Sequence, residues 1–219
     1  MTLLDFARGP AIEVAMVVFV FGVIWRLAWL LFLPHAQDRS KAKITGGALL
    51  SGTVGSFVRH MWPAKEYAAR TLVNTVASYT FHIGLAVIVF GFGQHIQFIR
   101  SITGLHWGGL PTAVISAVSV ITLAALLFML LRRLTNPVLK VISTFTDYWS
   151  WFVTTLPVVT GLAAVSHLWI RYEDLLGIHI LSVCLFLVSF PFGKLMHAFL
   201  VFVTRTQTGM FYSRRGAHV

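Results

Sequence analysis

Residues 178–200 read IHILSVCLFLVSFPFGKLMHAFL, an apolar segment with a histidine near each end, His179 and His197. Its length is sufficient to cross a bilayer, which takes about 20 residues in a helix. The histidines stand 18 positions apart, or five turns of an ideal helix, so we expect both imidazoles on one face, about 27 Å apart. Ionisable side chains inside a membrane are costly and usually functional. Two such histidines, one near each membrane boundary, indicate axial ligands for two stacked haems.

The composition places the chain among multi-pass helical membrane proteins. Its 219 residues are 57% hydrophobic and only 11% charged, and the mean hydropathy of +0.81 exceeds that of soluble domains. Basic cytoplasmic loops explain the formal net charge of +10, and we expect no nucleic-acid partner. The single cysteine, Cys184, excludes an internal disulfide and an iron–sulfur cluster held by this chain alone.

The apolar runs predict an all-α integral membrane bundle of five transmembrane helices, with residues 1–219 forming a single membrane domain. The predicted spans cover about residues 11–33, 75–98, 112–131, 148–170 and 176–202. A polar loop over 34–74 joins the first two spans. Within it, ALLSGTVGSFVRHMW mixes small, apolar and basic residues, and so fits an amphipathic helix in the membrane interface. A docking surface for a soluble partner and a solvated basic loop both remain open for this region.

Charge asymmetry predicts the orientation. The loop between spans one and two has six Lys or Arg residues, and the turn between spans three and four and the C-terminal tail have three each. The opposite side has only Arg8, Arg100 and Arg171. By the positive-inside rule, the loop over 34–74 is cytoplasmic, the N-terminus lies outside, and the C-terminus is cytoplasmic.

The orientation sorts the membrane histidines by depth. His82 and His197 fall toward the cytoplasm, whereas His95 and His179 fall toward the outer face. One histidine pair in each membrane half is what a two-haem b-type cytochrome needs, because two neutral imidazoles can bind one haem iron from opposite sides. The alternative is that each histidine only bonds a neighbouring helix.

The outer pair presents a geometric difficulty. His82 and His95 differ by 13 positions, or about 220° on an ideal helix, so they do not share a face. We expect Gly91 and Gly93 to end or distort the helix and so turn the His95 imidazole inward. Two further outer-side histidines, His106 and His167, are reserve ligands. The remaining histidines fall in loops or the tail and are predicted to be solvated: His35, His60 and His218.

Two motifs resemble a known family. FHIG at residues 81–84 and FPFGKLMH at 190–197 resemble the membrane cytochrome b gamma subunit of respiratory nitrate reductase, and its relative in sulfite-reductase-associated Dsr membrane complexes. The resemblance extends over all five spans. It implies two b haems that carry electrons between membrane quinone and an iron–sulfur subunit. It also implies that His82 and His197 hold the cytoplasm-side haem and that His179 holds one side of the outer haem.

The sequence departs from the nitrate-reductase pattern at Phe92, where that family has the second histidine of span two. The segments TNP at 135–137 and RRG at 214–216 are more similar to the Dsr-type relatives, in which this ligand lies further along. We therefore expect His95 to ligate the outer haem. Lys194 lies one turn before His197, where it either binds a propionate of the inner haem or snorkels to the cytoplasmic boundary.

These observations predict a dihaem electron-transfer subunit in a bacterial or archaeal inner membrane. It would exchange electrons between quinone, as substrate, and an iron–sulfur protein docked on the cytoplasmic side. One alternative is a transporter whose histidines relay protons, but the spans contain almost no carboxylates, since Glu13 and Asp147 fall near span ends. The other alternative is a haem-free anchor that only recruits soluble subunits.

Overall fold

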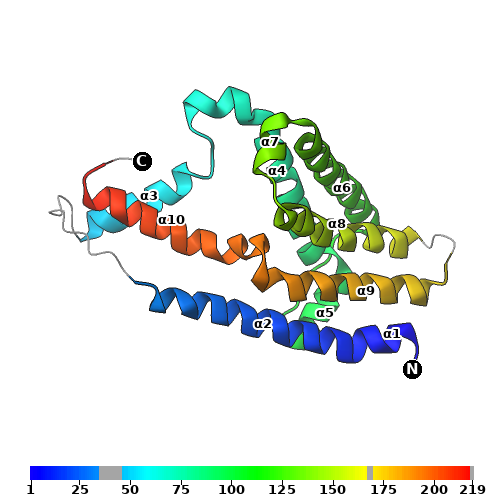
Figure 1. The fold of residues 1–219 in the computed structure, drawn as a ribbon. Helices are drawn as coiled ribbons and strands as arrows, with labels where there is room; N and C mark the ends of the chain where they lie inside the picture. Colours follow the sequence, from blue (N-terminus) through cyan, green and yellow to red (C-terminus); the bar gives the residue numbers. More distant parts are fainter. Residues whose placement is uncertain (35–45, 167–169, 218–219) are drawn as a thin grey trace. The chain divides into compact units, whose positions relative to one another are not determined.

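The chain is helical over nearly all of the residues described by the computed structural model, which are 1–34, 46–166 and 170–217 (Figure 1). Within these ranges there is no strand, only an isolated bridge between Phe92 and Leu110. Five helical segments are long and apolar enough to cross a membrane: Leu3–Phe32, Lys65–Gly91, Thr112–Thr135, Phe145–Ser166 and Tyr172–Phe192. The predicted all-α protein with five membrane helices is thereby confirmed, and the chain is a multi-pass membrane protein.

The chain divides into two compact units. Unit 1 comprises Met1–Phe19 and Leu72–Ser189, and unit 2 comprises Val20–Thr71 and Phe190–Val219. The first membrane segment contributes to both units. It consists of α1 (Leu3–Phe6), a π turn (Ala7–Ala11), α2 (Ile12–Trp29) and a final 3-10 turn (Leu30–Phe32).

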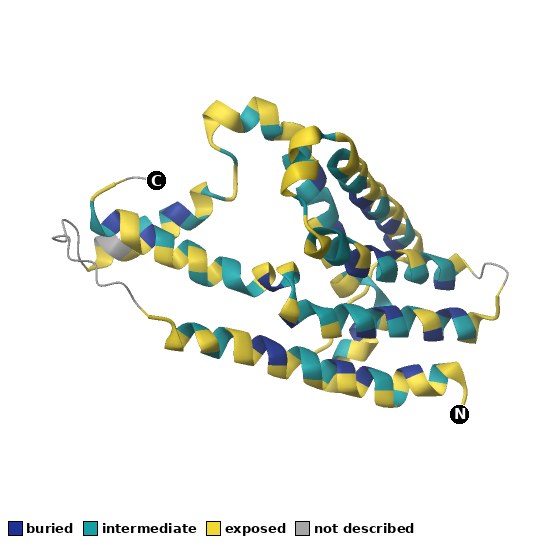
Figure 2. Ribbon diagram, in the orientation of Figure 1, coloured by how far each residue is buried: buried dark blue, intermediate teal, exposed yellow. Residues whose placement is uncertain are grey.

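Unit 1 is a bundle in which small residues let helices approach closely. α8 (Phe145–Ser166) packs against α6 (Thr112–Thr135) and α9 (Tyr172–Ser189), and α1 packs on α9. On α4 (Lys65–Gly91), Gly84 leaves no room for a side chain because Thr122 of α6 occupies that space. Large apolar side chains on the same helices stay exposed, as expected where lipid covers a bundle (Figure 2).

The turn between spans three and four is itself helical. Asn136 accepts hydrogen bonds from the amides of Val138 and Leu139, and Pro137 occupies the first turn of α7 (Pro137–Ile142). An ion pair of 3.1 Å joins Arg133 to Asp147, so the charges at this end of the spans compensate each other.

The second span is broken at the predicted glycines. α4 ends at Gly91, Phe92 is extended (φ −80°, ψ 126°), and α5 (Gly93–Thr103) begins directly afterwards. The span therefore covers different residues from the predicted 75–98, because α4 already begins at Lys65. The expectation that Gly91 and Gly93 end the helix is confirmed.

The fifth span differs from the continuous helix predicted over 176–202. α9 ends at Ser189, two 3-10 turns follow (Phe190–Phe192 and Lys194–Met196), and α10 (His197–Arg214) begins at the second histidine. Pro191 has no amide hydrogen to continue the helix, and Gly193 adopts an extended backbone. The expectation that His179 and His197 share a face of one ideal helix is therefore wrong.

Unit 2 shows that most of the predicted loop over 34–74 is helical. α3 (Gly47–Arg59) lies within the segment in which the sequence predicts an amphipathic helix, and α4 begins at Lys65. α3 runs alongside α10 (Figure 1). On α2, Gly22 faces Pro191, and a Cβ at this glycine would stand 2.6 Å from the proline ring.

Candidate functional site

His95 and His179 come together in unit 1. Their ring centroids lie 6.2 Å apart, and their planes differ by 20°. His95 belongs to α5 and His179 to α9, so the pair joins residues that are far apart in the sequence. Both side chains are half-buried. These are the two histidines that the sequence predicts as a pair, because both fall toward the outer face of the membrane.

The break after Gly91 determines the position of His95. Because the chain turns at Phe92, the His95 ring reaches back seven residues, and its Nδ1 donates to the Ile88 carbonyl oxygen at 2.9 Å. The Phe92 ring meets the imidazole edge-on, with centroids 5.2 Å apart and planes at 88°. Phe92, which occupies the position where the nitrate-reductase pattern predicts a histidine, thus packs against the imidazole of His95.

The following loop holds this break in place. The Leu110 amide donates to the Gly91 carbonyl oxygen at 2.7 Å, and the Trp107 indole donates to the Phe90 carbonyl oxygen at 2.6 Å. These bonds satisfy carbonyl groups that the interrupted helix leaves without an intrahelical partner. The orientation of His95 therefore depends on a folded loop as well as on the glycines.

His179 is oriented by α8. Its Nδ1 lies 3.2 Å from the Thr160 hydroxyl oxygen, which lies 2.9 Å from that of Ser182. Ser182 donates to the His179 carbonyl oxygen at 2.6 Å, and Thr160 has the Leu156 carbonyl oxygen at 2.9 Å as an acceptor. Since carbonyl acceptors take the hydroxyl hydrogens, the Thr160 oxygen is placed to accept from Nδ1.

Gly161 provides the space for the His179 ring. A Cβ at this glycine would stand 3.1 Å from Cε1 of His179, which is closer than ordinary packing allows. Sequence reasoning did not identify Gly161, Thr160 or Ser182 as site residues. No local pattern marks these residues, because their role depends on the packing of α8 against α9.

Three of the four predicted ligands, His82, His95 and His197, use Nδ1 in the same way, with a backbone carbonyl oxygen as acceptor. Nδ1 of His82 donates to the Ser78 carbonyl oxygen at 2.8 Å, and Nδ1 of His197 donates to the Lys194 carbonyl oxygen at 2.7 Å. A carbonyl oxygen only accepts, so in the neutral ring Nδ1 carries the hydrogen and Nε2 carries the lone pair. Metal-binding histidines typically have this arrangement, in which an outer partner fixes the tautomer and the orientation of the ring.

The spacing of the His95–His179 pair fits a shared metal. An imidazole nitrogen binds a transition metal at about 2.0 Å and lies about 1.1 Å from the ring centroid, so two opposed imidazoles on one metal have centroids about 6.2 Å apart. The observed separation of 6.2 Å, between ring planes that differ by 20°, is compatible with that value. The donor set, two neutral imidazoles with anchored Nδ1 atoms, is suitable for the axial positions of a haem iron.

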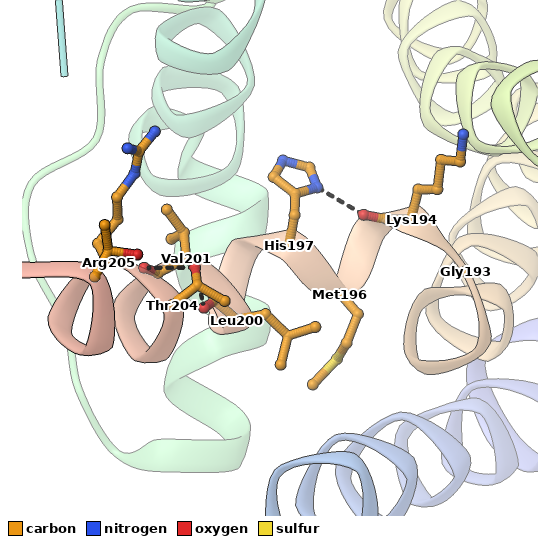
Figure 3. Close-up of a pocket in the computed structure, with 9 residues that line it drawn as sticks. Gly193, Lys194, Met196, His197, Leu200, Val201, Thr204 and Arg205 are labelled. Atoms are coloured by element: carbon orange, nitrogen blue, oxygen red, sulfur yellow. Dashed lines mark hydrogen bonds between the residues drawn. The ribbon is translucent and has the colours of Figure 1, made fainter. Parts of the chain in front are cut away.

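His82 belongs to unit 1 and His197 to unit 2. His82 is exposed on α4, and its ring centroid lies 4.0 Å from that of Phe81. His197 begins α10 and lines a cavity of about 640 Å³ formed entirely by residues 193–208. Figure 3 shows its imidazole between two basic side chains, Lys194 and Arg205.

Arg205 is a site residue that sequence reasoning missed. It was assigned to the tail because the fifth span was predicted to end at 202. In the structure it lies on α10, two turns beyond His197 and lining the same cavity as Thr204 and Thr208. The helical spacing of these residues is visible in the sequence once α10 is known to begin at His197.

The other histidines have varied settings. His106 is exposed in the loop between α5 and α6. His60 is the C-cap that follows α3 and is half-buried, with Nδ1 donating to the Ser56 carbonyl oxygen at 2.7 Å, so it is less solvated than expected. His35, His167 and His218 lie outside the described residues.

Comparison with known proteins identifies a relative. No family model matches the chain. A curated protein of Nitratidesulfovibrio vulgaris is 31% identical over 214 residues, covering 96% of this chain and 94% of the relative. The chain belongs to the family of this protein. Because the relative is named only "Protein", membership establishes a family shared over nearly the whole length and brings no activity with it.

Proposed function

We propose that the chain is a dihaem b-type cytochrome that exchanges electrons between membrane quinone and an iron–sulfur partner of a respiratory complex. The observation that carries the proposal is the pairing of His95 with His179 at a centroid separation compatible with a shared metal. The motifs at 81–84 and 190–197, with their similarity to nitrate-reductase gamma subunits and Dsr-type relatives, support it further.

At the outer site, His95 and His179 would hold the haem. Bound there, the haem would supply a one-electron carrier whose potential depends on its axial ligands and their hydrogen bonds. The protein's own contribution is orientation. Ile88 and Thr160 fix the two Nδ1 atoms, and Gly161 leaves room for the His179 ring.

At the inner site, His82 and His197 would hold the second haem. Their support is the motif resemblance and the same anchoring of Nδ1 by a backbone carbonyl. Lys194 and Arg205 would supply positive charge for the haem propionates, since both line the cavity that contains His197. Two haems in opposite membrane halves would let electrons cross the bilayer.

The proposed orientation and partners follow from charge. With the N-terminus outside and the C-terminus in the cytoplasm of a bacterial or archaeal cell, the basic segments face the cytoplasm. The iron–sulfur partner would dock on that side, and quinone would react within the membrane. A proton-relaying transporter is less well supported, because Asp147 at the end of span four is engaged in an ion pair with Arg133.

The haem content of the purified chain tests the proposal. We expect a pyridine haemochrome spectrum typical of haem b and a ratio of about two haems per chain. A chain purified without haem, while still folded and membrane-inserted, would refute the cytochrome and favour a haem-free anchor or a transporter. A ratio near one would leave a single haem and remove one of the two histidine pairs.

Thr160 is expected to tune the outer haem. In Thr160→Val the His179 Nδ1 loses its hydroxyl acceptor and keeps only the backbone of Pro157 as a partner, so the imidazole becomes a weaker electron donor to iron, and the midpoint potential of the outer haem should rise. A redox titration followed in the haem absorption bands measures this shift.

Two matched variants complete the test. Thr160→Ser keeps a hydroxyl and should restore the parent potential. In Thr155→Val, on the same helix, the lost hydroxyl bonds only the Trp151 carbonyl oxygen, so the potential should stay unchanged. An unchanged potential in Thr160→Val would show that this hydroxyl does not act on the ligand.

A further inference from the structure

The α3–α10 pair of unit 2 has a small-residue interface. Gly52 on α3 contacts the Ser213 side chain on α10, and a Cβ at Gly209 would stand 3.0 Å from the Thr53 backbone. Thr53, Ser56 and Ser213 are buried at this contact. Gly52 and Ser56 are four residues apart, as are Gly209 and Ser213, so each helix contributes two small residues from one face.

Phe57 of α3 also stacks on Phe202 of α10, with ring centroids 5.9 Å apart, but three other apolar residues of α3 point the other way. Leu50, Val54 and Val58 recur every four residues and are 68%, 55% and 59% exposed. At about 100° per residue they form one stripe, roughly opposite to the face that contacts α10. We call Leu50, Val54 and Val58 the outer stripe of α3. On α10, Met210 is likewise exposed, at 44%.

This arrangement is the reverse of helix pairing in water. In water, burial of Leu and Val side chains drives association, so the outer stripe would form the contact with α10. In lipid that driving force is absent, and helices associate through Gly, Ser and Thr while apolar side chains face the acyl chains. The α3–α10 pair therefore follows the membrane pattern.

The positive charge of unit 2 also favours a position at the membrane. The described residues of unit 2 contain eight Lys or Arg side chains and one carboxylate, Glu66. Arg59 ends α3 next to the outer stripe, and Lys65 begins α4. A basic segment of this kind complements the anionic headgroups of a bilayer surface.

From these observations we propose that α3 is an interfacial membrane helix whose outer stripe is covered by lipid acyl chains. Its 13 residues extend about 20 Å, less than the roughly 30 Å of the hydrocarbon core, so α3 lies in the membrane boundary without spanning it. α3, which comes between the first and second spans, thus presents its outer stripe to lipid. The proposal does not depend on haem.

Site-directed spin labelling of the whole chain tests this. In a Cys184→Ser background, which removes the buried native thiol, Val54→Cys carries a nitroxide. The protein is reconstituted in phosphatidylcholine–phosphatidylglycerol vesicles. Collision rates are measured with oxygen, which concentrates in lipid, and with a polar nickel chelate, which stays in water.

Two reference positions calibrate the measurement. Val120→Cys on α6, where the valine is 58% exposed on a membrane span, reports acyl chains. Glu173→Cys, at a side chain 60% exposed in an ion pair with Arg171, reports water. We expect the label at 54 to collide with oxygen as often as the label at 120, and with the nickel chelate far less often than the label at 173.

Two results would overturn the proposal. Frequent nickel collisions at 54 would place the stripe in water, where it would be available for a soluble partner. A label shielded from both reagents would mean that protein covers the stripe, as in a contact between two copies of the chain. Val58→Cys provides an independent reading on the same stripe if Val54→Cys does not fold.

Discussion

The His95→Ala variant is expected to purify with about half the haem of the parent chain, so that the haem-to-protein ratio falls from about two to about one. The reason is that the haem would have lost one of its two axial imidazoles, and a methyl group supplies no lone pair. His179→Ala should give the same ratio and the same residual spectrum, because the two rings form one pair with centroids 6.2 Å apart. Pyridine haemochrome assay and redox titration measure both outcomes.

His106→Ala is the matched control for this prediction. His106 lies in the same unit, just beyond α5, but is exposed in a loop. Its removal should leave both haems and their potentials unchanged. A His95→Ala protein that retained both haems would remove His95 from the ligand set. If His106→Ala lost a haem instead, the outer ligand would be the reserve histidine.

The His197→Ala variant is expected to lose the other haem. The remaining haem should titrate at the outer-site potential and should be the one that His95→Ala removes, so the double variant should contain none. The expectation rests on the FPFGKLMH motif and on the position of His197 in a cavity with two basic side chains. A redox titration identical to that of the parent chain would contradict the assignment.

His60→Ala is the control for the inner site. Like His197, His60 belongs to unit 2 and donates from Nδ1 to a backbone carbonyl oxygen in the preceding turn. His60 is the C-cap that follows α3 and is not among the residues that line the cavity around His197. Haem retention in His60→Ala together with haem loss in His197→Ala would separate ligation from a general effect of histidine removal on folding.

The sequence predicts the local features of this protein well. Length and hydropathy are sufficient to find five membrane segments, because the cost of placing polar groups in lipid acts on each segment independently. Gly91 and Gly93 correctly predict a helix break, since glycine weakens a helix wherever it lies. By contrast, the sequence predicts one continuous span over 176–202, whereas Pro191 and Gly193 end α9 and let α10 begin at His197.

What the sequence alone determined is the helical membrane architecture and a short set of candidate histidines. Only the tertiary structure decided how these residues are used. It brought His95 of α5 to His179 of α9, assigned Thr160 of α8 to the His179 Nδ1, and turned the outer stripe of α3 away from α10. The physical reason is that hydropathy and helix breaks are properties of consecutive residues, whereas a side-chain pair depends on how separate helices pack.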